Sequence, residues 1–398
     1  MKTYFSKFLV ILLSGFVCIQ CQDKQSEITN TQPITMTNDM LVDSLATERT
    51  VALFENLRSY TVDKVLFGHQ ETTAYGVGWV NDGFGNKSDV KEVCGDFPAV
   101  YGWDLGNIGQ RKNNDGIDFS EMKSLIKDAY KRGGIHTLSF HQHNPVTGNQ
   151  SWDVTPVVSH ILPGGDLHTS YIKRLDLVAE FIKELKDDDA SLIPVIFRPY
   201  HEHNGDWFWW GKGPASEQEF IALWQFTVDY LKNEKNVHNV LYAFSPDRSR
   251  IADPANPTEY LYGYPGDEYV DIFGLDNYYD LGSHWNQAPL DEQAEKLVQS
   301  LETIVGIAER RDKIPALTET GLDKLHIRGW WTNMLLAGID ANEVTRKIAY
   351  ALVWRNANAE HFHAPYPGHE SVADFMKFYN DSITVFEADL PDMYNIIE

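Results

Sequence analysis

An apolar run at residues 192–197 leads into the most chemically dense stretch of the chain, residues 198–207, which read Arg-Pro-Tyr-His-Glu-His-Asn-Gly-Asp-Trp. Ionisable side chains beside a buried strand carry a high desolvation cost unless they are paired or used in chemistry. A structural network of salt bridges is the alternative. The types of Arg198, Glu202 and Trp207 favour the rim of an active site at the end of this strand.

A second carboxyl group, that of Glu319, lies near the end of another apolar run at residues 314–320. Side chains alternate along a strand, so Arg198, Tyr200 and Glu202 are predicted to share one face of their run. If both runs belong to one barrel, Glu202 and Glu319 face each other across its mouth. Such a pair suits cleavage of a glycosidic bond, because Glu202 would protonate the leaving oxygen while Glu319 attacks the anomeric carbon. Spacing alone does not exclude three other carboxylates as members of the catalytic pair: Asp104, Asp247 and Asp276.

The proton donor and the nucleophile of such a pair need different environments to hold different protons. We expect His201 and the aromatic surroundings of Trp207 to keep the proton donor neutral. Arg198 and Tyr278 are expected to hold the nucleophile ionised through charge and hydrogen bonding.

Eight apolar runs, separated by segments with helical periodicity, organise the chain. The predicted strands are residues 65–70, 98–105, 134–141, 192–202, 239–247, 270–278, 314–320 and 348–356. Three- and four-residue spacing of apolar side chains predicts helices that include residues 119–132, 167–186, 216–233 and 290–311. This order predicts an α/β fold, a (β/α)8 TIM barrel. A doubly wound open sheet is the alternative, but no glycine-rich phosphate turn follows the first strand.

Polar residues gather at the ends of these runs, which is where a (β/α)8 barrel places its chemistry. They are His69, Glu71, Asp104, His141, His143, Glu202, Asp247, Asp276, Tyr278, Glu319, Trp354 and Asn356. A random acidic protein would scatter such groups over its helices.

The chain has 398 residues, of which 43% are apolar, and a formal charge of −23. This apolar content can bury a large core, and we predict that residues 41–398 form a single catalytic domain. An acidic surface without a basic stripe repels phosphates, so we expect no nucleic-acid partner. We expect a monomer that binds a neutral polysaccharide or oligosaccharide.

The first 21 residues have the pattern of an export signal. Lys2 and Lys7 flank the start of an apolar run, residues 8–13, which is too short to span a bilayer. Cys21 lies where a bacterial lipoprotein signal places its acylated cysteine, although the usual small residue before it is missing. The polar residues 22–40 suit a flexible tether. We expect an exported bacterial protein, either periplasmic or anchored to the outer membrane only by an N-terminal lipid. The alternative to lipidation is that the whole signal is cleaved off and no lipid is attached.

Several separate motifs make the chain similar to glycoside hydrolase family 26, best known for β-mannanases, over nearly all of residues 45–390. They are Arg198-Pro-Tyr-His-Glu202, Thr318-Glu-Thr-Gly321 and Phe140-His-Gln-His-Asn-Pro145, together with Trp207, Tyr278 and Trp354. Phe140 is a departure, because many relatives carry tryptophan before that histidine.

The resemblance implies a retaining mechanism with Glu202 as the acid/base and Glu319 as the nucleophile. It also implies that His141 contacts the sugar next to the scissile bond, that Tyr278 orients the nucleophile and that Trp354 forms the floor of that sugar site. The other predicted substrate-binding residues are Trp152, Arg198, His201 and Trp207.

Tryptophans near the barrel mouth are candidates for stacking on sugar faces, because the C–H surface of a pyranose suits a flat apolar ring. The candidates are Trp103, Trp152, Trp209, Trp210 and Trp285, with Trp207 beside the acid/base. About half of them are expected to be ordinary core or rim aromatics, and Trp152 and Trp207 are the first choices.

Three His-x-His pairs invite a metal-binding interpretation, because residues two apart on a strand face the same side. They are His141/His143, His201/His203 and His361/His363. Metal-dependent barrel hydrolases would carry such a pair on the first strand, where this chain has only His69. We therefore expect no metal and no cofactor, and interpret most of these histidines as hydrogen-bonding residues of the rim.

The resemblance predicts a β-1,4-mannanase acting on mannan, glucomannan or galactomannan. The alternative outside the enzymes is a lipoprotein that binds carbohydrate without cleaving it. The absence of Glu202 or Glu319 would have favoured this alternative, but both residues are present. Activity on xylan or mixed-linkage glucan is the alternative among enzymes. The choice between endo and exo action depends on the loops at residues 81–93, 107–118 and 321–340 and stays open.

Overall fold

The computed structural model describes residues 40–81, 83 and 85–397. The predicted export signal at residues 1–21, with Cys21, and nearly all of the predicted tether at residues 22–40 lie outside the described residues. Within the described part of the chain, no helix is both long enough and apolar enough to cross a membrane. Cys94 donates its thiol to the carbonyl of Val90 at 3.2 Å, and burial raises its pKa to about 12, so it is a poor nucleophile.

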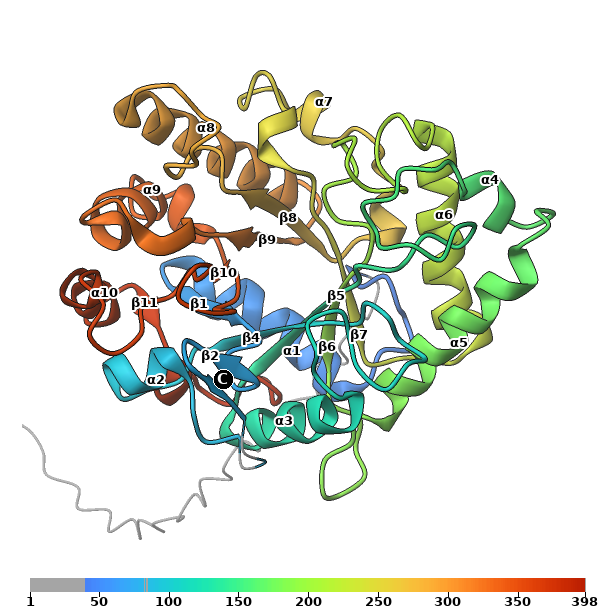
Figure 1. Cartoon of the computed structure of the whole chain (residues 1–398), viewed down its shortest axis with the longest axis horizontal. Coiled ribbons are helices and arrows are strands. Elements are labelled where there is room, and N and C mark those ends of the chain that lie inside the picture. Colours follow the sequence, from blue (N-terminus) through green and yellow to red (C-terminus); the bar gives the residue numbers. More distant parts are fainter. Residues whose placement is uncertain (1–39, 82, 84, 398) are drawn as a thin grey trace, which may run out of the picture. The chain divides into compact units, whose positions relative to one another are not determined.

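Eight parallel strands close into a barrel, as predicted (Figure 1). In chain order they are β1 (Val65–Gln70), β4 (Val100–Asp104), β5 (Ile135–Ser139), β6 (Val195–Arg198), β7 (Val240–Phe244), β8 (Ile272–Asn277), β9 (Ile314–Thr320) and β10 (Tyr350–Val353). Strand β10 pairs with β1, with Leu66 beside Tyr350, and this pairing closes the barrel. The short strand β11 (Thr384–Val385) also pairs with β1, and β2 (Tyr75–Gly76) forms a separate hairpin with β3 (Trp79–Val80).

Helices lie between the strands and surround the barrel (Figure 1). They are α1 (Glu48–Ser59), α2 (Asp89–Cys94), α3 (Phe119–Arg132), α4 (Val158–Ile161), α5 (His168–Glu184), α6 (Glu217–Asp229), α7 (Pro257–Tyr260), α8 (Leu290–Glu309), α9 (Ala337–Ile339) and α10 (Val372–Tyr379). Single 3-10 turns lie at Tyr60–Val62, Arg248–Arg250, Asp267–Tyr269, Asp323–Leu325, Thr345–Lys347 and Glu387–Asp389, and π-helical turns at Tyr230–Glu234 and Trp331–Leu336. Helices α3, α5, α6 and α8 correspond to the four predicted segments.

Local signals explain where these helices begin and end. The side chain of Asp118 accepts a hydrogen bond from the backbone of Ser120 at the start of α3, and Gly133, with φ of 103°, ends that helix. Ser216 and Glu219 form a reciprocal capping box at the start of α6.

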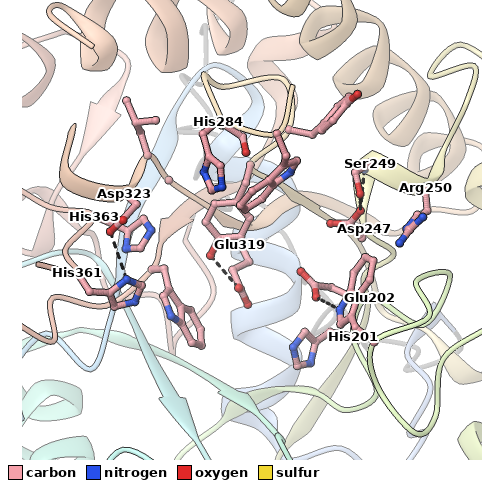
Figure 2. Close-up of a pocket in the computed structure, with 18 of the residues that line it drawn as sticks. His201, Glu202, Asp247, Ser249, Arg250, His284, Glu319, Asp323, His361 and His363 are labelled. Carbon is pink, nitrogen blue, oxygen red and sulfur yellow. Dashed lines mark hydrogen bonds and ion pairs between the residues drawn. The ribbon is translucent and has the colours of Figure 1, made fainter. Parts of the chain in front are cut away.

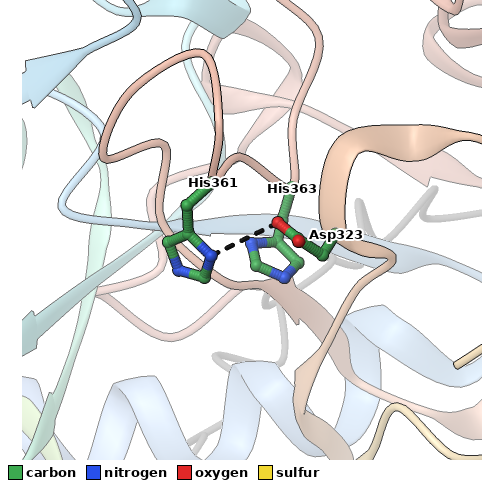
Figure 3. Close-up of side chains that lie close together, drawn as sticks. All are labelled: Asp323, His361 and His363. Carbon is green, nitrogen blue, oxygen red and sulfur yellow. Dashed lines mark ion pairs between the residues drawn. The ribbon is translucent and has the colours of Figure 1, made fainter. Parts of the chain in front are cut away.

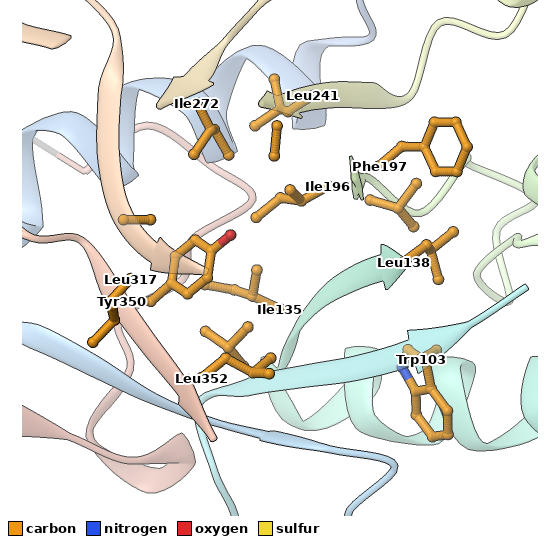
Figure 4. Packing of buried hydrophobic residues seen from close by; sticks show 14 of the residues in the cluster. Trp103, Ile135, Leu138, Ile196, Phe197, Leu241, Ile272, Leu317, Tyr350 and Leu352 are labelled. Carbon is orange, nitrogen blue, oxygen red and sulfur yellow. The ribbon is translucent and has the colours of Figure 1, made fainter. Parts of the chain in front are cut away.

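The barrel strands are buried along their whole length, because one face of each points into the barrel and the other lies under helices. Figure 4 shows side chains from seven of these strands packed together: Trp103, Ile135, Leu138, Ile196, Phe197, Leu241, Ile272, Leu317, Tyr350 and Leu352. At the carboxyl ends of the strands this core gives way to buried polar groups, among them Arg198 and Asp276. The polar groups are therefore held by the most tightly packed part of the fold.

Strands β8 and β9 approach each other closely where their register shifts, between Gly274 and Asp276. A Cβ atom on Gly274 would lie 2.5 Å from both Oγ1 and Cγ2 of Thr318. The same Thr318 hydroxyl donates to Oδ1 of Asp276 at 2.8 Å. The absence of a side chain at Gly274 therefore allows the packing that positions Asp276.

We expect Gly274→Ala to lower the free energy of unfolding by about 1–3 kcal/mol, because the added methyl group overpacks the contact with Thr318. Gly306→Ala is the control. Gly306 lies inside α8, where a Cβ would meet only Arg310 Nη1 at 3.3 Å, so this change should stabilise by about 0.5–1 kcal/mol. Urea unfolding measures both; a Gly274→Ala protein as stable as the parent would contradict the packing argument.

Candidate active site

A cleft of about 810 Å³ lies at the carboxyl ends of the strands (Figure 2). Eight of the nine predicted site residues line it: His141, Trp152, His201, Glu202, Trp207, Tyr278, Glu319 and Trp354. The ninth, Arg198, lies beneath the cleft surface with 2% of its area exposed and pairs with Glu319. The fold thus brings all nine together, and their individual roles stay predictions.

Arg198, the last residue of β6, bridges two carboxylates inside the barrel. Its Nη1 donates to Oδ2 of Asp276 at 2.5 Å, and its Nη2 pairs with Oε2 of Glu319. Asp276 is fully buried and takes a further hydrogen bond from Thr318 at 2.8 Å. A guanidinium suits this place because its planar fork can serve two acceptors at once.

Glu319, near the end of β9, is held on two sides. Arg198 binds one oxygen, and the hydroxyl of Tyr278 donates to the other, Oε1, at 2.8 Å. Burial, followed by the charge of Glu319, raises the pKa of Tyr278 well above its usual value. The hydroxyl therefore stays protonated and acts as a hydrogen-bond donor. Arg198 and Tyr278 are the two partners that the sequence predicts for Glu319.

Glu202 faces Glu319 across the cleft (Figure 2) and has the opposite environment. Burial raises its pKa well above the usual value, and the negative charges of Asp247 and Glu319 add to this. The predicted role of His201 is wrong, because this ring lies against His141. The predicted burial among aromatic side chains agrees with the main cause, but Trp207 Nε1 also donates to Glu202 Oε2 at 2.8 Å, a bond that favours the charged form. Glu202 is therefore suited to carry a proton at neutral pH.

The chain reaches Glu202 through a turn, and the predicted strand alternation is wrong here. Strand β6 ends at Arg198, and φ is 51° at Tyr200 and 55° at Glu202, in the left-handed region. Tyr200 points into the helix layer, where its hydroxyl lies 2.7 Å from Thr227 of α6. Positive φ at non-glycine residues is typical of strained active-site turns, and here it turns Glu202 toward the cleft.

A buried aspartate sets the charge of His141. Oδ2 of Asp104 lies 2.7 Å from Nδ1 of His141. Burial would lower the pKa of this histidine, but the charge of Asp104 outweighs it and the pKa is raised. Burial, and then the charges of Arg198 and His141, lower the pKa of His201 well below its usual value. His201 is therefore neutral and accepts a hydrogen bond from His141, with 3.1 Å between their Nε2 atoms.

The tryptophans divide into two groups. Trp152 and Trp285 are 58% and 57% exposed and line the cleft with Trp207 and Trp354. Trp103, Trp209 and Trp210 are fully buried, so these three are wrong as stacking candidates, in line with the expectation that about half of the candidates are ordinary core or rim aromatics. Trp209 and Trp210 instead donate to the carbonyls of Gln142 and His201, which fixes two loops of the site.

Two of the rival carboxylates are occupied elsewhere. Asp104 pairs with His141, and Asp276 pairs with Arg198, and neither lines the cleft. Asp247 does line it, with a pKa raised to about 6 by burial. Sequence reasoning missed several loop residues of the cleft, because no periodic pattern marks them: Ser249, Arg250, Tyr279, His284, Lys324 and His326.

Comparison with known proteins places this geometry in a family. The profile of glycosyl hydrolase family 26 matches residues 42–347. A mannan endo-1,4-β-mannosidase of Bifidobacterium adolescentis is 40% identical over 290 residues, which make up 70% of this chain and 27% of that relative. The chain thus spans about a quarter of that relative's length.

Two solved structures are similar over most of the chain. A family 26 β-mannanase from Bacteroides ovatus has a TM-score of 0.80 at 40% identity, covering 88% of this chain and 98% of that one. A modular endo-β-1,4-mannanase from Cellulomonas fimi has a TM-score of 0.82 at 36% identity, covering 89% and 79%.

We expect Arg198→Met to destabilise the protein by about 3–5 kcal/mol, because Asp276 and Glu319 would share a buried site without a cation. Arg111→Met is the matched control. Arg111 also pairs with a carboxylate, Asp118, but is 84% exposed, so its loss should cost no more than about 1 kcal/mol. Thermal and denaturant unfolding measure the difference; similar losses for both variants would show that the buried pairing does not matter.

Proposed function

The chain belongs to glycosyl hydrolase family 26, and on that premise we propose that it is a retaining β-mannanase that cleaves β-1,4-mannosidic bonds within mannan, glucomannan or galactomannan. The names of its relatives, mannan endo-1,4-β-mannosidase and β-mannanase, support the substrate and the endo mode. One observation carries the proposal. Two carboxyl groups face each other in one cleft; burial raises the pKa of Glu202, while Arg198 and Tyr278 bind the two oxygens of Glu319.

In the first step Glu202 donates its proton to the glycosidic oxygen as the bond from that oxygen to the anomeric carbon breaks. The carboxylate of Glu319 attacks the same carbon and forms a covalent glycosyl ester. The leaving part of the polysaccharide departs as an alcohol. The hydrogen bond of 2.8 Å from Tyr278 orients one oxygen of Glu319, and the guanidinium of Arg198 binds the other.

In the second step Glu202, now a carboxylate, takes a proton from water, and the oxygen of this water attacks the anomeric carbon and displaces Glu319. Glu202 returns to its protonated form. Its raised pKa makes it a better base than an ordinary glutamate. Two displacements at one carbon leave the product with the configuration of the substrate.

Aromatic rings would bind the sugars on both sides of the scissile bond. The rings of His141 and Trp354 lie 5.8 Å apart, so the indole can support the sugar that is attacked while the imidazole contacts its edge. Trp207 is tied to Glu202, and Trp152 packs on Phe208 with 4.7 Å between ring centroids, so both can hold the adjoining sugars.

We also propose that the protein is exported, on the basis of residues 1–21, and tethered to a membrane by a lipid on Cys21. Metabolic labelling with a radioactive fatty acid tests this, with Cys21→Ser as the comparison.

Products released from mannan, xylan and mixed-linkage glucan test the activity. We expect hydrolysis of mannan, and a loss of at least about a thousandfold in Glu202→Ala and Glu319→Ala, because each removes a group that acts in the transition state. Glu343→Ala, which removes an exposed glutamate outside the cleft, should keep full activity. A folded wild-type protein that hydrolyses none of the three would contradict the proposal and favour a binding protein. Release of mannobiose alone from the start would favour exo action.

The basic limb of the pH profile of kcat/KM should follow Glu202, because the first step needs its proton and activity is lost as pH rises through its pKa. Trp207→Phe removes a hydrogen bond that lowers this pKa, so the limb should move to higher pH. Asp247→Asn removes a charge that raises it, so the limb should move to lower pH. If the basic limb moves in the same direction in both variants, or does not move in either, a group other than Glu202 sets this limb.

A further inference from the structure

Three side chains of metal-binding type converge in the wall of the cleft, on the side away from Glu202 (Figures 2 and 3). Asp323 follows β9, and His361 and His363 come from the loop after β10. One carboxylate oxygen and one ring nitrogen from each histidine all lie within 4.8 Å of one another. In the part of the chain that the structure describes, this is the one group of three or more histidine, cysteine, aspartate or glutamate residues whose ligand atoms lie this close together. The sequence shows only the two histidines as a pair.

The spacing of these atoms resembles that of a coordination shell. Nδ1 of His361 lies 3.2 Å from Oδ1 of Asp323. Two ligands bound tetrahedrally to zinc at about 2.0 Å lie about 3.3 Å apart, so this pair already has the spacing of one edge of the tetrahedron. The ring centroids of His361 and His363 lie 5.0 Å apart, and the ring planes are at 82°. Small side-chain rotations would therefore bring the ring nitrogen of His363 to the same spacing from the other two ligand atoms.

His363 is held in the way that metal-binding histidines commonly are. Its Nδ1 lies 3.2 Å from the carbonyl of Arg355 and donates to it, which leaves Nε2 without a proton and free to bind. Its backbone N–H donates to Oδ1 of Asn356 at 2.9 Å, and Nδ2 of Asn356 donates to the carbonyl of Ala364 at 2.9 Å. These bonds fix the loop and the orientation of the ring.

The charges around the group are compatible with a cation. The two neighbouring cations have carboxylate partners of their own. Arg355 pairs with Asp115 at 3.0 Å, and Lys324 pairs with Glu360 at 2.6 Å.

We propose that Asp323, His361 and His363 form a binding site for a divalent transition-metal ion such as Zn²⁺, with its remaining coordination position open to the cleft. Two imidazoles and one carboxylate suit zinc, nickel or copper and not calcium or magnesium, which prefer oxygen ligands. The ring of His363 lies 5.9 Å from that of Tyr278, which holds Glu319. A bound ion would therefore narrow the cleft next to Glu319 and exclude substrate, a consequence that rests on the proposed function.

Zinc binding to the untagged protein, stripped with a chelator and measured by isothermal titration calorimetry, tests the site. We expect one Zn²⁺ per chain and no comparable binding of Ca²⁺. Asp323→Ala and His361→Ala should each weaken binding at least about tenfold. Their side chains are 48% and 39% exposed, so both variants should fold. His160→Ala is the matched control, because His160 pairs with Asp166 at 2.6 Å on the surface without a third ligand, and its zinc affinity should equal that of the parent.

X-ray absorption of the zinc complex should show nitrogen and oxygen ligands near about 2.0 Å and no sulfur. A sulfur shell would place the ion on a cysteine such as Cys94 and overturn the proposal. Wild-type protein that binds no zinc, or binding that is equal in all variants, would overturn it as well. These binding readouts are independent of hydrolysis. If the protein cleaves mannan, zinc should raise KM and leave kcat unchanged, and this inhibition should disappear in His361→Ala.

Discussion

The buried guanidinium of Arg198 is the interaction on which the rest of the site depends. It lies inside the barrel between Asp276 and Glu319, where a single charge without partners would carry a penalty of several kcal/mol. The two carboxylates compensate that charge, and the guanidinium in turn offsets part of the cost of burying them, although burial still raises the pKa of Asp276 well above its usual value. Strands β6, β8 and β9 supply these three groups, so the pairing fixes their mutual position as well as their charge.

One cation among several carboxyl groups creates the asymmetry that the chemistry requires. Arg198 reaches Asp276 and Glu319 but not Glu202, which lies across the cleft and faces Asp247. Burial and like charges therefore raise the pKa of Glu202 in the same cleft in which Arg198 binds Glu319. Positive φ at Tyr200 and Glu202 is part of this arrangement, because the turn brings Glu202 into the cleft and packs Tyr200 under the helices. Charge separation and backbone strain thus act together.

The sequence predicts the barrel well, because apolar runs and helical patterns are local and the carboxyl ends of its strands meet by topology. It also indicates the pair of Arg198 and Glu319, since a buried cation needs a carboxylate partner. It does not predict what depends on packing between distant segments. The burial of Trp209 and Trp210 follows from how the loop after β6 folds back. The contribution of Asp247 to the raised pKa of Glu202, and the meeting of Asp323 with His361 and His363, arise only in three dimensions.

The most direct test of this account is to trap the covalent intermediate with a mannosyl fluoride that carries fluorine at C2. Fluorine at C2 destabilises the oxocarbenium-like transition states of both steps, while the fluoride leaving group keeps the first step fast enough for the ester to accumulate. Mass spectrometry of the digested protein should find one 2-deoxy-2-fluoromannosyl group, on the peptide that contains Glu319 and on that residue. A label on Glu202 or Asp247, or no label together with a product of inverted configuration, would contradict it.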